Sequence, residues 1–265
     1  MSTARDVAFA LDPALFMAAG GKPPDQWQEQ ALRSRSKRQL LLASRQSGKS
    51  TTMAALALHT AIYGEPGLIL LLSRALRQSQ ELFRKVLDFY RSLGETAGLE
   101  AESALRLEMK NGSRIISLPG NEETVRSYSN VKLLVIDEAS RVPDALYFSV
   151  RPMLAVSGGR LVCLTTPWGK RGFFYEGWTG PEDWERIQIT ADQCPRISRA
   201  FLDEERRTMG EFWYKQEYLT EFVEPTDQLF TYESIQAALS DEVSPLFTAD
   251  PLAELWKRNA SPLAG

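Results

Sequence analysis

The sequence predicts an α/β fold with a mostly parallel sheet flanked by helices, and three features of its pattern support this. Apolar runs at residues 39–42, 67–72, 131–136 and 161–164 have the length of strands and few polar positions, as expected for strands covered on both faces. Segments with helical spacing of apolar residues follow them, at about 50–63, 75–93 and 143–154. Polar residues gather just after the first and third runs, and ligands of such sheets bind at the carboxyl ends of the strands.

The rest of the chain adds smaller elements to this plan. We expect short helices at 13–19 and 27–34, and a hairpin at 105–109 and 113–118, where Asn111-Gly112 is a strong turn signal. A strand is expected at 184–189, helices at 198–209 and 211–219 separated by Gly210, and a short strand at 220–223. Beyond residue 224 the character of the sequence changes, with one more helix expected at 229–239.

Composition excludes several classes of protein. The 265 residues carry a formal net charge of −3, so any nucleic-acid contact would have to use a local basic patch. The densest one, Arg33, Arg35, Lys37 and Arg38, is either a solvated face or a phosphate-backbone contact. With two cysteines, no C-x-x-C pair and one histidine, a zinc site is not expected. No apolar run approaches the ~18 residues that span a bilayer, and two thiols fit a reducing cytoplasm.

The first polar turn has the pattern of a phosphate-binding loop. The strand at 39–42 meets a small polar turn, and Gly48-Lys49-Ser50 opens the helix that follows. Gly48 permits a backbone that brings N–H groups near phosphate oxygens, Lys49 can reach the β- and γ-phosphates, and Ser50 can hold Mg²⁺. Ala43 replaces the usual first glycine of G-x-x-x-x-G-K-[ST]. The predicted nucleotide-binding residues are Ser44, Arg45, Gln46, Ser47, Gly48, Lys49, Ser50 and Thr51.

Two carboxylates follow the third apolar run. Asp137 and Glu138 come directly after the strand at 131–136, at the sheet edge where the phosphate loop is also expected. Asp137 would complete the Mg²⁺ shell, and Glu138 would orient and polarise the attacking water. The other interpretation, a strand that ends in an acidic turn, does not account for the phosphate loop upstream.

Two further features belong near this predicted site. Gln28 precedes the loop, and its amide, which is both donor and acceptor, could contact the edges of adenine or simply lie on a helix surface. Thr165 and Thr166 end the strand expected at 160–166, where their hydroxyls could sense the γ-phosphate. They could equally form an ordinary turn before Pro167. Position along the chain leaves both pairs of alternatives open.

Together these motifs resemble those of the large terminase subunits of tailed bacteriophages. The loop at 44–50, with Arg45 and Gln46 inside it, is similar to that family's deviant phosphate loop, and Gln28 with Pro24 to its adenine-binding motif. Further similar segments follow in the family's order at 73–78, 111–120, 134–139, 165–167, 172–175 and 216–222. The resemblance spans roughly residues 24–232, and the shared order of several motifs makes it specific.

The resemblance implies a P-loop NTPase fold of the additional-strand, catalytic-glutamate type, in a domain at 1–223 with lid elements from the N-terminal region and roughly 190–223. It implies an ATP- and Mg²⁺-dependent motor that drives double-stranded DNA into a procapsid as a homo-oligomeric ring. Portal protein and terminase small subunit would be its partners, in the host cytoplasm and without a membrane. Residues 224–265 leave room for a linker and tail only, so we expect the family's nuclease domain to be absent.

Two arginines compete for the role of arginine finger. Arg45 lies inside the loop and would act within its own subunit, whereas Arg126 lies in the polar stretch 120–130, where the family has an arginine that faces a neighbouring subunit. Two other functions also remain. A helicase-like DNA translocase shares these motifs but needs a second motor domain, and a truncated prophage remnant would bind nucleotide without packaging DNA.

Overall fold

The computed structural model describes residues 3–94, 98–120, 125, 128–224 and 237–238. The chain divides into two units, Met1–Val223 and Glu224–Gly265, and the fold below is that of the first unit. The assignment of 224–265 as linker and tail stays a prediction, and most of the helix expected at 229–239 lies outside the described residues.

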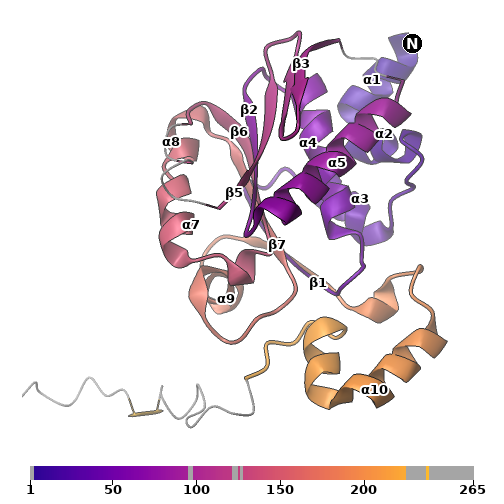
Figure 1. Ribbon diagram of the computed structural model, residues 1–265, viewed down its shortest axis with the longest axis vertical. Coiled ribbons are helices and arrows are strands. Elements are labelled where there is room, and N and C mark those ends of the chain that lie inside the picture. The colour runs from indigo at the N-terminus through magenta and orange to yellow at the C-terminus, as the bar shows by residue number, and fades with distance from the viewer. Residues whose placement is uncertain (1–2, 95–97, 121–124, 126–127, 225–236, 239–265) are drawn as a thin grey trace, which may run out of the picture. The chain divides into compact units, whose positions relative to one another are not determined.

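One sheet organises the first unit (Figure 1). In the described part of the chain its eight strands follow the order β3-β4-β5-β2-β6-β7-β1-β8. The pairs β3–β4 and β4–β5 are antiparallel, and the strands from β5 to β8 along this order pair in parallel, which confirms the mostly parallel sheet. The bounds are β1 Arg38–Ala43, β2 Leu68–Ser73, β3 Leu99–Ser103, β4 Arg106–Met109, β5 Arg114–Pro119, β6 Val131–Asp137, β7 Arg160–Thr165 and β8 Glu185–Ile189.

Helices cover both faces of this sheet. The first five lie on one face and α7 to α9 on the other, while α10 lies below the end of β1 (Figure 1). The bounds are α1 Thr3–Leu11, α2 Pro13–Ala19, α3 Gln26–Arg33, α4 Lys49–Tyr63, α5 Leu76–Ser92, α7 Asp144–Val150, α8 Met153–Ser157, α9 Gly172–Thr179 and α10 Arg199–Glu217. Two short 3-10 turns complete the set, η1 Ala139–Arg141 and η2 Ala191–Gln193.

The apolar strand runs are explained by two separate cores. Along β2, Ile69 and Leu71 pack into the core beneath α1 to α5, whereas Leu68, Leu70 and Leu72 pack into the core beneath α7 to α9. Full burial of each such side chain stabilises the fold by about 1.5–3 kcal/mol. A third, small cluster joins the 3-10 turn η2 to α10. The sheet can therefore be apolar on both sides, as the sequence predicted.

The structure differs locally from the sequence prediction at several points and agrees with it at Gly210. Helix α1 and edge strand β3 were not expected. The helix predicted at 143–154 is broken into α7 and α8, because Pro152 has no N–H to continue the helical hydrogen bonds. The strand predicted at 220–223 is wrong, since Thr220 has a φ of +57° and the Glu221 N–H turns back to the Lys215 carbonyl. Gly210, with φ of +79°, kinks α10 where the sequence placed a break.

The order of strands decides where a ligand can bind. Strand β7 lies between β1, which leads into the phosphate loop, and β6, which ends in Asp137. This is the additional strand that the resemblance implied. Because β1, β6 and β7 are parallel, their carboxyl ends meet at one edge of the sheet and bring residues 44–50, 137–141 and 165–168 together.

Candidate nucleotide and metal site

The phosphate loop joins β1 to α4 through two left-handed residues. Gly48 has φ of +94°, and a Cβ there would lie 2.8 Å from Gln28 Nε2, so both its conformation and its surroundings favour glycine. Gln46 also has a left-handed backbone, with φ of +58°, although its Cβ makes this conformation less favourable than it is for glycine. The Ser47 hydroxyl donates to the Ser44 carbonyl oxygen at 2.9 Å. The loop therefore aims the amino end of α4 at one place, a geometry suited to anion binding.

Lys49 supplies the positive charge inside this loop. Its Nζ donates to the carbonyl oxygens of Ala43 at 3.0 Å and Ser44 at 2.9 Å. Burial lowers the pKa of the Lys49 ammonium, and the negative charges of Glu138 and Asp137 oppose that shift. Ala43, the residue in place of the usual glycine, is itself buried at the end of β1.

Ser50 and Asp137 form the candidate metal site. Ser50 Oγ donates to Asp137 Oδ2 at 3.2 Å, although the two residues are far apart in sequence. Burial raises the pKa of the Asp137 carboxyl, and Lys49 counters it. A hydroxyl and a carboxylate at this separation are the oxygen donors that Mg²⁺ accepts in nucleotide-binding proteins, with water and phosphate oxygens completing the shell. The residues present therefore fit the predicted cation.

Glu138 lies beside this pair in an uncommon conformation. Its φ of +54° and ψ of +41° are left-handed, and its N–H donates to Asp137 Oδ1 at 2.9 Å. Burial and the Asp137 charge raise the pKa of the Glu138 carboxyl, which Lys49 and Arg141 oppose. Arg141 Nε lies 3.9 Å from Glu138 Oε2, and the Arg141 guanidinium stacks 4.0 Å above the centroid of the Trp168 ring. A strained, half-buried carboxylate is typical of a functional position.

The two threonines at the end of β7 are joined to the turn after Glu138. Thr165 Oγ1 and Ser140 Oγ are 2.7 Å apart, and Ser140 Oγ donates to the Thr166 carbonyl oxygen at 2.8 Å. Both threonines are buried. The carboxyl ends of β7 and β6 are thus hydrogen-bonded to each other next to Glu138.

Gln28 packs on the loop with both ends of its amide occupied. Nε2 donates to Thr52 Oγ1 at 2.8 Å, and Oε1 accepts the Asp25 N–H at 2.8 Å. Asp25 also receives both ends of the Arg196 guanidinium, whose Nη2 donates to the Ser47 carbonyl oxygen at 2.8 Å. In this structure Gln28 braces the phosphate loop, and its assignment to adenine stays a prediction.

Of the two candidates for the arginine finger, the structure describes one, Arg45. The Arg45 N–H donates to the Glu217 carbonyl oxygen at 3.0 Å, and Arg45 Nε lies 3.6 Å from the Glu217 carboxylate, which ties the loop to α10. Its side chain is largely exposed. Arg126 lies outside the described residues, so its role stays a prediction.

The remaining predicted residues occupy the edges of the site. Gln46 is exposed on the loop, and Thr51 is half-buried in the first turn of α4. Among the described residues, no group of three or more histidine, cysteine or carboxylate side chains could hold a metal ion. Within the same residues, every helix is too short or too polar to cross a membrane.

Sequence reasoning missed several residues that the fold brings to this edge. Ser140 and Arg141 lie two and three residues after Glu138, so their closeness to it could have been inferred from position. Arg196 and Trp168 carried no such signal, because their contacts with Asp25 and Arg141 depend on the tertiary fold.

Comparison with protein families decides the affiliation of the chain. The sequence model of the family described as "Terminase large subunit, T4likevirus-type, N-terminal" matches residues 40–237. The chain belongs to this family. Curated terminase large subunits from Thermus phage G20c and Thermus virus P23-45 are each 23% identical over 253 residues, covering 82% of this chain. The chain spans about half the length of these relatives, 52% of each.

Solved terminase structures share the fold. The large terminase ATPase domain of Thermus phage P74-26 superposes with a TM-score of 0.69 at 22% identity, covering 79% of this chain and 98% of that one. The large terminase of the thermophilic bacteriophage D6E in complex with ADP gives a TM-score of 0.62 at 13% identity, covering 76% and 54%. The α/β fold of a terminase ATPase domain is therefore confirmed.

Proposed function

We propose that this chain is an ATP-hydrolysing motor domain of a terminase large subunit, which drives double-stranded DNA into a procapsid. The observation that carries the proposal is the 3.2 Å contact between Ser50 Oγ and Asp137 Oδ2, with Lys49 and Glu138 beside it. Family membership and the complex of the D6E terminase with ADP support the choice of nucleotide.

Each residue of the site has a separate role in this proposal. The loop N–H groups and Lys49 bind the phosphates, and Ser50 and Asp137 hold Mg²⁺. Bound Mg²⁺ would offset the charge on the phosphate oxygens. Glu138 orients the attacking water and takes up its proton, and Thr165 and Thr166 link the state of the γ-phosphate to neighbouring segments. Arg45 contacts the nucleotide from within the subunit.

The partners in this proposal follow from the family. The active form is a homo-oligomeric ring in the host cytoplasm that works with a portal protein and a terminase small subunit. Magnesium dependence is part of the proposal. The expectations that this chain has no nuclease activity, and that lid elements lie in the N-terminal region and at about 190–223, stay predictions.

Two alternatives have different consequences. A helicase-like translocase would unwind or move on DNA without a procapsid, but the family match favours the packaging motor. A prophage remnant would bind ATP without turnover. The intact set of Lys49, Ser50, Asp137 and Glu138 favours an active enzyme.

Steady-state ATP hydrolysis, measured with and without double-stranded DNA, tests the proposal. Glu138→Gln should keep ATP affinity and lower turnover by ~10²-fold or more, as expected when a positioned base is lost. The control is Glu65→Gln, which changes an exposed carboxylate beyond the carboxyl end of α4, opposite the phosphate loop. If Glu138→Gln hydrolyses ATP like the parent, Glu138 is not the catalytic carboxylate; if the parent has no turnover, the remnant interpretation holds.

A further inference from the structure

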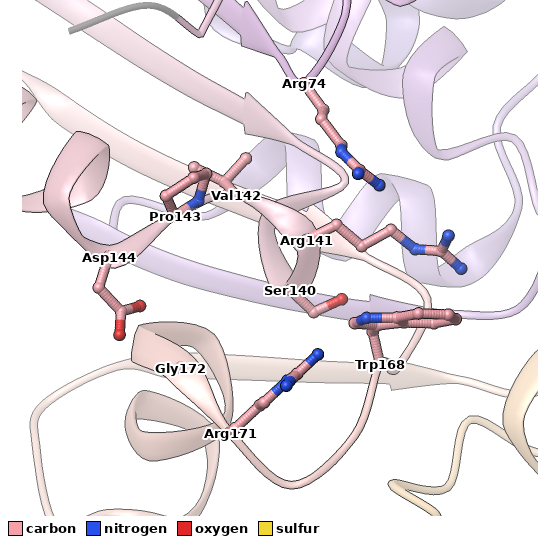
Figure 2. A pocket seen from close by; sticks show the side chains of 9 residues that line it. All are labelled: Arg74, Ser140, Arg141, Val142, Pro143, Asp144, Trp168, Arg171 and Gly172. Carbon is pink, nitrogen blue, oxygen red and sulfur yellow. The ribbon is translucent and has the colours of Figure 1, made fainter. Parts of the chain in front are cut away.

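A second cavity lies at the same edge of the sheet, next to the nucleotide site. It has a volume of about 500 Å³ and collects residues that follow three neighbouring strands. Arg74 follows β2, Ser140 and Arg141 follow β6, and Trp168 and Arg171 lie between β7 and α9. Figure 2 shows Arg141 above the Trp168 ring, and Arg171 directed toward Ser140 and Trp168.

This cavity has an unusual excess of positive charge. Three guanidinium groups line it, against a single lining carboxylate, Asp144, whose Oδ1 is engaged by the Phe173 N–H at 2.8 Å. Glu138, 3.9 Å from Arg141, offsets one of the three charges and leaves those of Arg74 and Arg171. Figure 2 shows Asp144 apart from the arginine head groups. Within the described part of the chain, Arg74 and Arg171 have no ion-pair partner. In a chain of net charge −3, such a local excess points to an anionic ligand.

The cluster at 33–38, which the sequence singled out, is a weaker candidate. Arg33 is already paired with Asp12 at 2.9 Å and Glu29 at 2.6 Å, and Lys37 donates to the Gly158 carbonyl oxygen. Those contacts would have to be given up for a ligand. The cavity arginines Arg74 and Arg171 would gain a partner without losing one.

The chemistry of the lining selects phosphate. Guanidinium groups present paired N–H donors that match phosphate oxygens, and stacking on Trp168 fixes the plane of the Arg141 group before any ligand arrives. The arginines come from separate segments, so a ligand with successive phosphates can contact more than one of them. We propose that this cavity binds phosphates of the DNA backbone. This inference rests on the proposed motor function and assigns a DNA-binding site to the chain.

The position of Arg141 would couple this site to hydrolysis. Arg141 lines the cavity and lies 3.9 Å from Glu138 Oε2, while Ser140, also in the lining, is hydrogen-bonded to Thr165. A backbone phosphate in the cavity competes with Glu138 for the Arg141 guanidinium. DNA occupancy therefore changes the surroundings of the catalytic carboxylate.

DNA binding by the full chain tests the site. We would measure the affinity of Arg74→Ala, Arg171→Ala and the double variant for a labelled duplex by fluorescence anisotropy over a range of salt concentrations. Affinity falls as salt rises, and each phosphate contact removed should make this negative slope of log affinity against log salt shallower by about 0.9. Binding should weaken equally for unrelated sequences. The double variant should also lose DNA stimulation of ATP turnover. Arg84→Ala, an exposed arginine on α5, is the matched control.

The outcomes separate this inference from the motor function itself. A parent with no ATP turnover and no DNA binding overturns both. A parent with DNA-stimulated turnover, together with a double variant that keeps the affinity, salt slope and stimulation of the parent, overturns the cavity alone. Titration with inorganic phosphate at constant ionic strength adds a third arm. If the double variant loses phosphate binding but keeps DNA binding, the cavity takes free phosphate and the DNA assignment is wrong.

Discussion

Arg141 is the described cation nearest to the Glu138 carboxylate by ion-pair distance. It lies 3.9 Å from Glu138 Oε2 on one side and 4.0 Å above the Trp168 ring on the other, so its charge is held next to the proposed catalytic carboxylate. Arg141→Ala should therefore lower turnover without DNA by about tenfold, of the order expected when a positioning contact is lost. ATP affinity should change little, because Arg141 has no contact with the phosphate loop in this structure.

Arg141→Lys serves as the control for this prediction. Lysine keeps the charge but not the planar group that stacks on tryptophan, so only part of the turnover should return. Equal kinetic constants in the parent and in Arg141→Ala would show that Glu138 is positioned by its own backbone.

Gln28 has two possible roles, a contact with adenine and a brace of the phosphate loop, and these roles can be distinguished by experiment. Its amide is bonded to Thr52 and Asp25, so an adenine contact requires one of these hydrogen bonds to be exchanged. Gln28→Ala should weaken ATP binding, and the adenine proposal predicts a smaller loss for GTP. Isothermal titration with both nucleotides measures this. An equal loss for ATP and GTP would assign Gln28 to bracing the loop alone.

Among single residues, the sequence predicted those whose position in the site follows from local patterns along the chain. Lys49, Ser50 and Asp137 could be placed because a strand, a turn and a helix are local patterns, and parallel strands bring their ends together. Arg196 could not be placed, since its bonds to Asp25 and Ser47 join segments that share no local pattern.

The ends of β6 and β7 are joined by a hydrogen bond at the scale of elements. Thr165 is bonded to Ser140 in η1, and the coupling proposal predicts that a movement at one strand end is transmitted through this bond to the other. Replacing Thr165 and Thr166 by valine keeps their shape and removes both hydroxyls. We expect DNA-stimulated hydrolysis to fall several-fold while ATP affinity stays near that of the parent, since a neutral hydrogen bond contributes about 1 kcal/mol. Unchanged stimulation in the double variant would contradict the coupling role.

Helix α4 contains the only histidine, His59, and we expect its partial burial to make stability depend on pH. His59 Nε2 bonds to the Phe9 carbonyl oxygen at 2.8 Å, and its ring packs against Phe16 and Tyr63. Burial lowers the pKa of His59, which the Phe9 bond and the Asp12 charge oppose. The folded state thus favours the neutral ring, and this contribution is present above the unfolded pKa of about 6.5 and lost as pH falls below it.

Denaturant unfolding measured from about pH 7.5 to about pH 5, a range of roughly 2.5 units that includes this pKa, tests the effect. The free energy of unfolding should fall with decreasing pH by at most about 1.4 kcal/mol per unit from this one proton. His59→Phe should flatten the curve in this window, because the ring is replaced and the titration removed. A variant with the same slope as the parent would place the pH dependence elsewhere.

The strands show which secondary structure can be predicted from the sequence pattern alone. Strand β2 was predicted because residues 68–72 are all apolar, and the structure explains this pattern by covering the strand with a core on each face. Strand β3, Leu99–Ser103, was not, because its exposed polar side chains look like a loop and only pairing with β4 makes it a strand. The strand predicted at 220–223 is absent because its first residue, Thr220, has a left-handed backbone that the sequence pattern does not reveal.

At the scale of the whole molecule, the proposed ring raises the question of what one subunit gives to the next. Negative charge spreads over the γ-phosphate oxygens in the transition state, and an arginine supplied there accelerates phosphoryl transfer by ~10³–10⁵. Arg45 is linked to Glu217 of its own chain, which suits a role within the subunit. We therefore keep Arg126 as the candidate that acts on a neighbouring subunit.

Mixing two inactive variants tests this assignment. Arg126→Ala and Glu138→Gln should each be inactive alone, one lacking the arginine and the other the carboxylate. In a mixed ring, a Glu138→Gln subunit can give its intact Arg126 to a neighbour that retains Glu138. With equal amounts and random assembly, about one junction in four has this arrangement, so part of the turnover should return. Both variants must bind ATP and assemble like the parent. If they do, and no mixture exceeds the sum of its components, Arg126 does not act between subunits.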